Sequence, residues 1–230
     1  MQTSLGYILR TRPYTDASVI VDLYTKSAGR LTCITRPSKL RGKVQKGHLQ
    51  AFRILQLHWQ GRSDLSRLTQ TDERFRHRIP AGHLLYGLYL NELLLKVIQT
   101  HSPMDALFTA YQNTLQLLSE TELPMIVVMR FELVLLEELG HMPDLWQDDE
   151  HGETINGDSN YNYGVKTGLH LQQTSAVEYD KVRISGSLLI AIREPDTMSL
   201  EQYEDLRRFL DALWMQIVRK PFNSRKLIRL

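Results

Sequence analysis

The chain has 230 residues, 42% of them hydrophobic, and a formal net charge of +2. Its apolar stretches are interrupted by Arg, Glu or Lys before they reach the roughly 20 residues that a membrane span needs, and no basic-then-apolar leader follows Met1. Cys33 is the single cysteine, which excludes intrachain disulfides and multi-cysteine zinc sites. We therefore expect a soluble cytoplasmic protein in which Cys33 packs within a strand.

Positive charge is concentrated in the first third of the chain. Residues 1–80 hold 15 Lys and Arg against 5 Asp and Glu, whereas residues 81–230 hold 13 against 21. Such asymmetry is typical of a protein whose basic part binds a polyanion. The break near residues 80–82 predicts two domains, residues 1–80 and residues 81–230.

The first 80 residues are typical of short strands joined by turns. The β-rich runs are LGYILRTRPY, ASVIVDLYT, LTCIT, AFRILQLHW and DLSRLTQTDERFR. Closing five such strands into a small barrel buries one face and removes the exposed edges. We predict a five-stranded OB-fold barrel, the type that binds oligonucleotides and oligosaccharides, with a small SH3-like barrel as the alternative.

One connection of the predicted barrel is strongly basic. Residues 36–47, RPSKLRGKVQKG, hold five cations, and no carboxylate occurs between Asp22 and Asp64. A charge run is often only a solvated loop. Because nothing local neutralises this one, we expect DNA phosphate to be its counterion.

The candidate nucleic-acid-binding residues combine cations for phosphate with aromatic rings for stacked bases. The barrel cations are Arg10, Arg12, Arg30, Arg36, Lys39, Arg41, Lys43, Lys46, Arg74, Arg76 and Arg78. The last three alternate, so on a regular strand they would share one face. The aromatic candidates are Tyr7, Tyr14, Tyr24, Phe52, Trp59 and Phe75, of which we expect four to be core. Phosphate contacts are not base-specific, so binding should tolerate any sequence and weaken with salt.

From His83 the hydrophobic period becomes helical. Helices are predicted over residues 83–99, 102–120 and 123–140 and near residues 185–194 and 200–220. An acidic, Gly- and Asn-rich segment at about 144–172 is expected to carry a small hairpin. The predicted fold class is α+β, an N-terminal OB-fold barrel followed by a mainly α-helical domain with this hairpin insertion.

No catalytic signature occurs in the sequence. The most chemical-looking cluster is Asp148, Asp149, Glu150 and His151, whose contiguous side chains cannot all converge on one ion from an extended loop. We expect a solvated loop there, no metal, no cofactor and no enzymatic activity.

Arg130 stands out because nearly all its neighbours in MIVVMRFELVLLEEL are apolar. The simpler interpretation is an ion pair with Glu132, Glu137 or Glu138. The functional one is an arginine at the rim of an apolar groove, suited to a peptide with a hydrophobic anchor and negative charge.

Taken together, the segments resemble the RecO family of bacterial recombination mediators. The resemblance rests on RPYTDASVIVDLYTKSAGRL, LYGLYLNELLLKVI, RFELVLLEELG and KPFNSRKLIR in this order, and it covers most of the chain. It implies an OB fold followed by a helical domain and a non-enzymatic role in DNA repair. RecO-like proteins bind single- and double-stranded DNA, anneal complementary strands and, with RecR, help load RecA onto strands coated by single-stranded DNA-binding protein (SSB).

The resemblance also implies roles for particular residues. Relatives contact the acidic, phenylalanine-ended SSB tail through the helical domain, which makes Arg130 a candidate, although Met129 replaces a second basic residue there. Many relatives hold zinc through four cysteines after the third helix, but residues 141–170 contain none, so no zinc is expected. A C-terminal basic cluster of Lys220, Arg225, Lys226 and Arg229 is either favourable charge near a helix end or a secondary DNA contact. The implied location is the cytoplasm, in association with the nucleoid.

Three other functions stay open on the sequence alone. One is a protein-docking adaptor without intrinsic DNA function, and another is a metal-dependent nuclease that uses Asp148, Asp149 and Glu150. The third is an RNA-binding barrel, because nothing in these residues reports a preference for a 2′-hydroxyl.

Overall fold

The computed structural model describes residues 1–38, 44–61, 65–173 and 181–228. By its contacts the chain divides into two compact units, Met1–Val128 with Phe222–Leu230 and Met129–Pro221. The domain boundary predicted near residue 80 follows shortly after the last barrel strand, which ends at Arg76. The division into domains at residues 1–80 and 81–230 stays a prediction. Among the described residues, no helix combines the length and the hydropathy required to cross a membrane.

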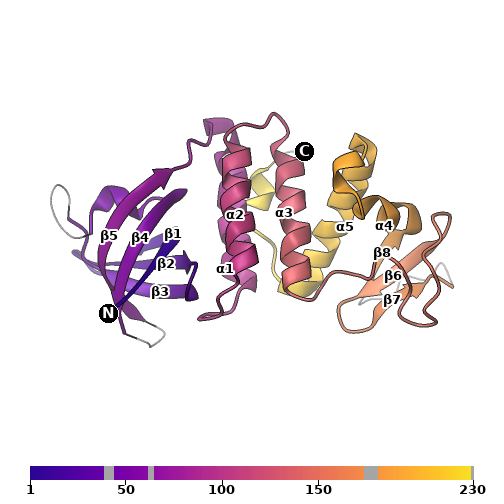
Figure 1. Ribbon diagram of the computed structural model, residues 1–230, viewed down its shortest axis with the longest axis horizontal. Helices are drawn as coiled ribbons and strands as arrows, with labels where there is room; N and C mark the ends of the chain where they lie inside the picture. The colour runs from indigo at the N-terminus through magenta and orange to yellow at the C-terminus, as the bar shows by residue number, and fades with distance from the viewer. Residues whose placement is uncertain (39–43, 62–64, 174–180, 229–230) are drawn as a thin grey trace. The chain divides into compact units, whose positions relative to one another are not determined.

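Five strands of the first unit close into a barrel (Figure 1). They are β1 (Gln2–Pro13), β2 (Val19–Thr25), β3 (Gly29–Thr35), β4 (Arg53–Gln60) and β5 (Ser66–Arg76). Around the barrel their order is β1-β2-β3-β5-β4, with β3 parallel to β5 and β4 antiparallel to β1. This five-stranded closed barrel is OB-like. The predicted barrel is confirmed, and the SH3-like alternative is wrong.

The barrel interior is apolar because the inward positions of the alternating strands carry aliphatic side chains. Val21, Leu23 and Leu57 are completely buried there, as is Cys33 on β3. Burial disfavours the thiolate and raises the pKa of Cys33 to about 12. Cys33 is therefore a protonated packing residue, as expected.

Two helices pack against the barrel within the first unit, α1 (Leu84–Val97) and α2 (Asp105–Leu118). Asn91 of α1 donates from Nδ2 to the carbonyl oxygen of Leu9 at 3.0 Å and accepts a hydrogen bond from the Tyr111 hydroxyl at 2.5 Å. The Tyr111 ring meets Tyr7 edge-on, with 5.0 Å between the ring centroids. These satisfied buried polar groups fix both helices on the strands.

The second unit contains a small sheet and two further helices (Figure 1). Helix α3 (Pro124–Glu138) leads into it, followed by β6 (Asn160–Gly164), β7 (Gly168–Leu171), β8 (Val182–Ser185), α4 (Gly186–Ile192) and α5 (Leu200–Val218). The sheet order is β7-β6-β8. The predicted hairpin is β6–β7, and the unpredicted β8 adds a third strand. The α+β fold class is confirmed.

Short 3₁₀ helices complete the described elements. They are η1 (Lys46–Leu49), η2 (Ala81–His83), η3 (Pro195–Thr197) and η4 (Arg225–Leu227). Helix α5 begins with a capping box, in which the Ser199 side chain accepts from the Gln202 backbone and the Gln202 side chain accepts from the Ser199 backbone. This reciprocal pairing satisfies two backbone donors and fixes where the helix starts.

Candidate functional site

Two of the predicted phosphate-binding arginines share a carboxylate. Arg10 Nε donates to Asp22 Oδ2 at 2.8 Å, Arg12 Nη2 lies 3.5 Å from the same oxygen, and the Thr32 hydroxyl donates to Asp22 Oδ1 at 2.9 Å. Only 2% of the Asp22 side chain is exposed, whereas about half of each arginine side chain is exposed. The arginines are held at the barrel surface, but part of their charge is already neutralised.

Other predicted cations have no carboxylate partner among the described residues. Arg30 Nε donates to the carbonyl oxygen of Ile98 at 2.9 Å, and Arg36 Nε donates to Ser18 Oγ at 3.3 Å. Because these acceptors are neutral, they orient the guanidinium groups without neutralising their positive charge. The exposed side chains of Lys46 and Lys220 form no ion pair with a described residue. Lys39, Arg41 and Lys43 lie outside the described residues.

A β-bulge at Arg74 interrupts the alternation of β5, since Glu73 and Phe75 pair with consecutive residues of β4. Arg76 therefore lies on the same side as Glu73, whose Oε1 accepts a hydrogen bond from Arg76 Nε at 3.3 Å. The regular alternation expected from Arg74 through Arg78 is wrong. The exposed guanidinium groups of Arg74 and Arg78 form no ion pair with a described residue.

Beside the bulge, an aromatic ring is exposed next to two arginines. Phe75 is 49% exposed and contacts the buried His77 edge-on, with 5.1 Å between the ring centroids. Together with Arg76 and Arg78 it lines a hollow of about 620 Å³. Glu73 and three residues of and after α2, Gln116, Ser119 and Glu120, complete the lining. The hollow therefore presents a flat ring beside Arg78, which forms no ion pair with a described residue, and beside Arg76, which is paired with Glu73.

The prediction that four of the six aromatic candidates belong to the core is confirmed. The buried four are Tyr7, Tyr24, Phe52 and Trp59. Tyr14 and Phe75 remain exposed. Of these two, Phe75 is the ring that shares a hollow with arginine side chains.

The segment between Lys220 and Arg225 of the C-terminal basic cluster is fastened to α1. Glu92 accepts hydrogen bonds from the backbone N–H groups of Asn223 and Ser224 at 2.9 Å each, and Lys96 Nζ lies 3.0 Å from it. Within the cluster, Arg225 Nη1 donates to the Ile228 carbonyl oxygen at 3.3 Å. The side chain of Lys226 and all of Arg229 lie outside the described residues.

In the second unit, Arg130 lies at the edge of a largely apolar hollow of about 460 Å³. Its Nη1 lies 2.7 Å from Asp196 Oδ1, and its Nε donates to the Tyr203 hydroxyl at 3.0 Å. The expected ion pair between Arg130 and a glutamate of its own helix is wrong. Arg130 pairs with Asp196 in η3, and Glu132 pairs with Arg207.

The apolar walls of this hollow come from three separate segments. They include Leu133, Val134, Met142, Leu145, Trp146, Ile192 and Pro195. Trp146 is 65% exposed, and the guanidinium carbon of Arg193 lies 4.2 Å from the centroid of its ring. Sequence reasoning missed Trp146 and Arg193, and the available signal was a tryptophan two residues before the acidic run Asp148–Glu150. The hollow thus combines apolar walls with two guanidinium groups and with the carboxylates of Glu137 and Asp196.

The chain as a whole can be compared with known proteins. The family model described as Recombination protein O N terminal matches residues 1–73, and that described as Recombination protein O C terminal matches residues 82–225. The chain belongs to the RecO family. The DNA repair protein RecO of Aliivibrio salmonicida is 34% identical over 225 residues, covering 96% of this chain and 92% of that protein. The RecO of Vibrio parahaemolyticus is 32% identical over 228 residues, covering 96% and 90%.

In this RecO chain, tyrosines and carboxylates organise the segment after α3. The Tyr163 hydroxyl donates to the His141 carbonyl oxygen at 2.9 Å, and the Tyr161 hydroxyl accepts from the Asn156 N–H at 2.9 Å. The backbone N–H of His151, followed by those of Glu150 and Glu153, lowers the pKa of Asp148. Within the described part of the chain, no three His, Cys, Asp or Glu residues are grouped to hold a metal ion. The hydrogen bonds of Asp148 show that this carboxylate shapes the loop.

Proposed function

We propose that this RecO chain is a recombination mediator that binds single- and double-stranded DNA, anneals complementary strands and, with RecR, helps load RecA onto SSB-coated DNA. The observation that carries the proposal is the exposed Phe75 ring beside Arg76 and Arg78. Non-specific single-strand binding uses this combination, with an aromatic face for a base and cations for the backbone.

Annealing follows from a basic surface that is blind to sequence. Neutralising phosphates lowers the repulsion between two strands, and base pairing then supplies the specificity. The exposed side chains of Arg74 and Lys46 add further positive charge to the surface of the first unit. Such a protein needs no catalytic residue, metal or nucleotide, and we place its action in the cytoplasm on nucleoid DNA.

We assign the SSB tail to the hollow at Arg130. Its apolar walls suit a phenylalanine side chain, and the guanidinium groups of Arg130 and Arg193 suit carboxylates. Asp196 competes with the tail because it already pairs with Arg130. The Asp196 side chain is 88% exposed, so it is free to turn into solvent when a peptide carboxylate replaces it.

The test is annealing of complementary oligonucleotides, bare or precoated with SSB, with no nucleotide or metal added. The chain should accelerate both reactions. Phe75→Ala should slow both, whereas Arg130→Ala should slow only the coated reaction. Acceleration of neither reaction would contradict the mediator function and favour a protein-docking adaptor.

A further inference from the structure

A third hollow, of about 540 Å³, runs between β8 and α5 in the second unit. Residues 181–185 line one side of it, and Asp205, Arg208, Phe209 and Gln216 of α5 line the other. It shares no lining residue with the hollow at Arg130. Because a whole strand borders it, the hollow offers backbone groups as well as side chains.

The backbone of β8, whose residues line this hollow, carries hydrogen-bonding groups that do not pair with β6. β8 is the last strand of the sheet and pairs with β6. One position beyond their register, the Gly186 N–H donates to the Ser159 carbonyl oxygen at 2.8 Å. Hydrogen-bonded positions alternate along an antiparallel ladder, so Val182 and Ile184 bond to β6 and Arg183 points its N–H and C=O outward. Among the described residues, no partner of these two Arg183 groups occurs.

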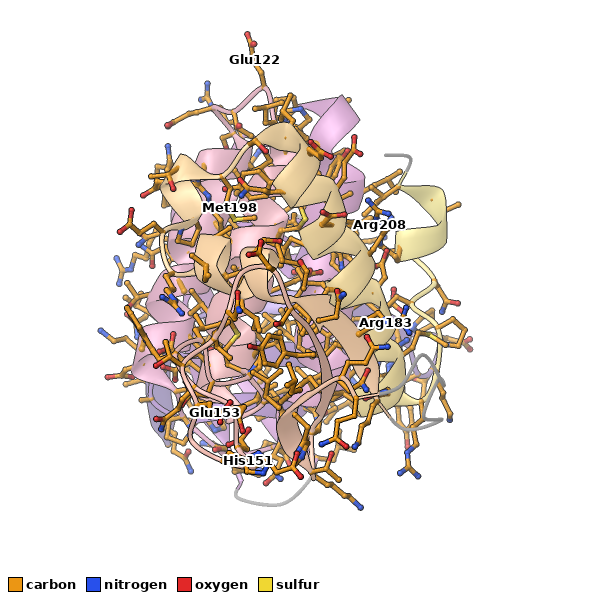
Figure 2. All side chains as sticks on the ribbon, turned by 90° about the vertical axis from the view of Figure 1, so that its right-hand side faces the viewer. Glu122, His151, Glu153, Arg183, Met198 and Arg208 are labelled. Atoms are coloured by element: carbon orange, nitrogen blue, oxygen red, sulfur yellow. The ribbon has the colours of Figure 1, made fainter. Side chains whose placement is uncertain are left out.

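The side chains around this edge are apolar at the base and basic at the rim. Val182, Ile184, Leu188 and Phe209 are all buried and form the base. Figure 2 shows Arg183 of β8 and Arg208 of α5 on the same side of this unit. Arg208 Nη2 lies 2.5 Å from Asp205 Oδ1, whereas the exposed side chain of Arg183 forms no ion pair with a described residue. The rim therefore keeps net positive charge.

We propose that the outer edge of β8 docks an extended acidic segment of a partner protein, which adds to the sheet as a fourth strand. The partner's backbone pairs with Arg183, its apolar side chains cover the base, and its carboxylates bind Arg183 and Arg208. A peptide suits this edge better than a nucleic acid does. A phosphodiester backbone has no N–H donors at the strand repeat, while a peptide supplies donors and acceptors in alternation.

The probe is a fluorescein-labelled octapeptide of alternating Asp and Val residues, titrated with the full chain by fluorescence anisotropy. Binding should weaken about tenfold in Arg183→Glu and in Arg208→Glu, which corresponds to about 1.4 kcal/mol each. Lys166→Glu is the matched control, because it makes the same charge change at the exposed β6–β7 turn, outside the groove. A Lys-Val octapeptide that bound as well as the Asp-Val one would overturn the charge complementarity.

Backbone pairing is tested without altering the protein. Two versions of the Asp-Val octapeptide are compared, one N-methylated on every Asp and the other on every Val. Since the N–H groups of an extended strand point alternately to either side, only one version loses the N–H groups that face β8. That peptide should lose binding, and the other should keep it. Equal affinity of the two would overturn strand addition. Loss of dT12 binding in Arg183→Glu with unchanged peptide binding would assign the groove to nucleic acid instead.

Discussion

Arg207 of α5 and Glu132 of α3 form a buried ion pair. Arg207 Nη1 lies 2.7 Å from Glu132 Oε2, and 1% and 0% of the two side chains are exposed. The second terminal nitrogen, Nη2, lies 3.0 Å from Asp211 Oδ1. Taking both charges out of water costs several kcal/mol per ion, and their attraction offsets this cost only while both are present.

Removing one member of this pair should therefore destabilise the second unit strongly. We expect Glu132→Ala to lower the free energy of unfolding by about 3–5 kcal/mol, since it leaves Arg207 buried without its main countercharge. Urea denaturation followed by circular dichroism measures the loss. The double variant Glu132→Leu with Arg207→Met should recover most of it. A single variant as stable as the parent would contradict the role given to the pair.

Glu92 gives a prediction about pH. Burial raises its pKa, but hydrogen bonds from the side chain and backbone of Ser224, from the Asn223 backbone and from Lys96 outweigh this and lower the pKa to about 2. The unfolded chain, whose ordinary value is 4.5, takes up the proton first. The stabilisation is thus present above about pH 4.5 and is lost as the pH falls toward 2.

Glu92→Gln should remove this pH dependence and, at neutral pH, cost roughly 1.5–3 kcal/mol, the usual contribution of hydrogen bonds to a charged group. Thermal unfolding at several pH values between 2 and 7 measures both effects. Glu122→Gln, which changes an exposed carboxylate, is the matched control. Equal pH slopes in the parent and Glu92→Gln would rule out Glu92 as the titrating group.

What the sequence predicts well is what depends on neighbours along the chain. Strand alternation and turns between β1 and β5 indicate the barrel, and the helical period after His83 indicates the helices. The bulge at Arg74 was not predictable, because it is set by the register with β4. The same holds for Asp22, which binds Arg10 only after two strands pair.

Arg74 and Arg78, which form no ion pair with a described residue, should matter more for DNA binding than the arginines held by Asp22. Arg74→Ala and Arg78→Ala should each lower the slope of log affinity against log salt for dT20 by about 0.7, one phosphate contact on a single strand. Arg10→Ala should lower it less, since Arg10 shares a carboxylate with Arg12. Anisotropy titrations at several NaCl concentrations measure the slopes. An equal or larger change in Arg10→Ala would reverse the assignment.

Phe75 should contribute to affinity without contributing to the salt dependence. Base stacking on an aromatic ring is worth about 1–3 kcal/mol per base, so Phe75→Ala should weaken dT20 binding by at least about fivefold at every salt concentration. Phe75→Tyr keeps the ring and should retain the affinity. Tyr14→Ala is the comparison at the other exposed aromatic residue of the barrel. If Phe75→Ala binds dT20 as tightly as the parent, no base stacks on Phe75.

Arg130 Nη1 lies 2.7 Å from Asp196 Oδ1, and substitutions of these two residues should have opposite effects on the affinity for the SSB tail. Arg130→Ala removes a carboxylate ligand and should weaken binding of an acidic, phenylalanine-ended tail peptide. Asp196→Asn removes the competing carboxylate and should strengthen binding, by up to about 1 kcal/mol because the pair is exposed. A purely structural ion pair would instead make both variants less stable and change binding in neither. Calorimetric titration with the peptide and thermal unfolding of both variants separate these cases, and weaker binding in Asp196→Asn would contradict the competition.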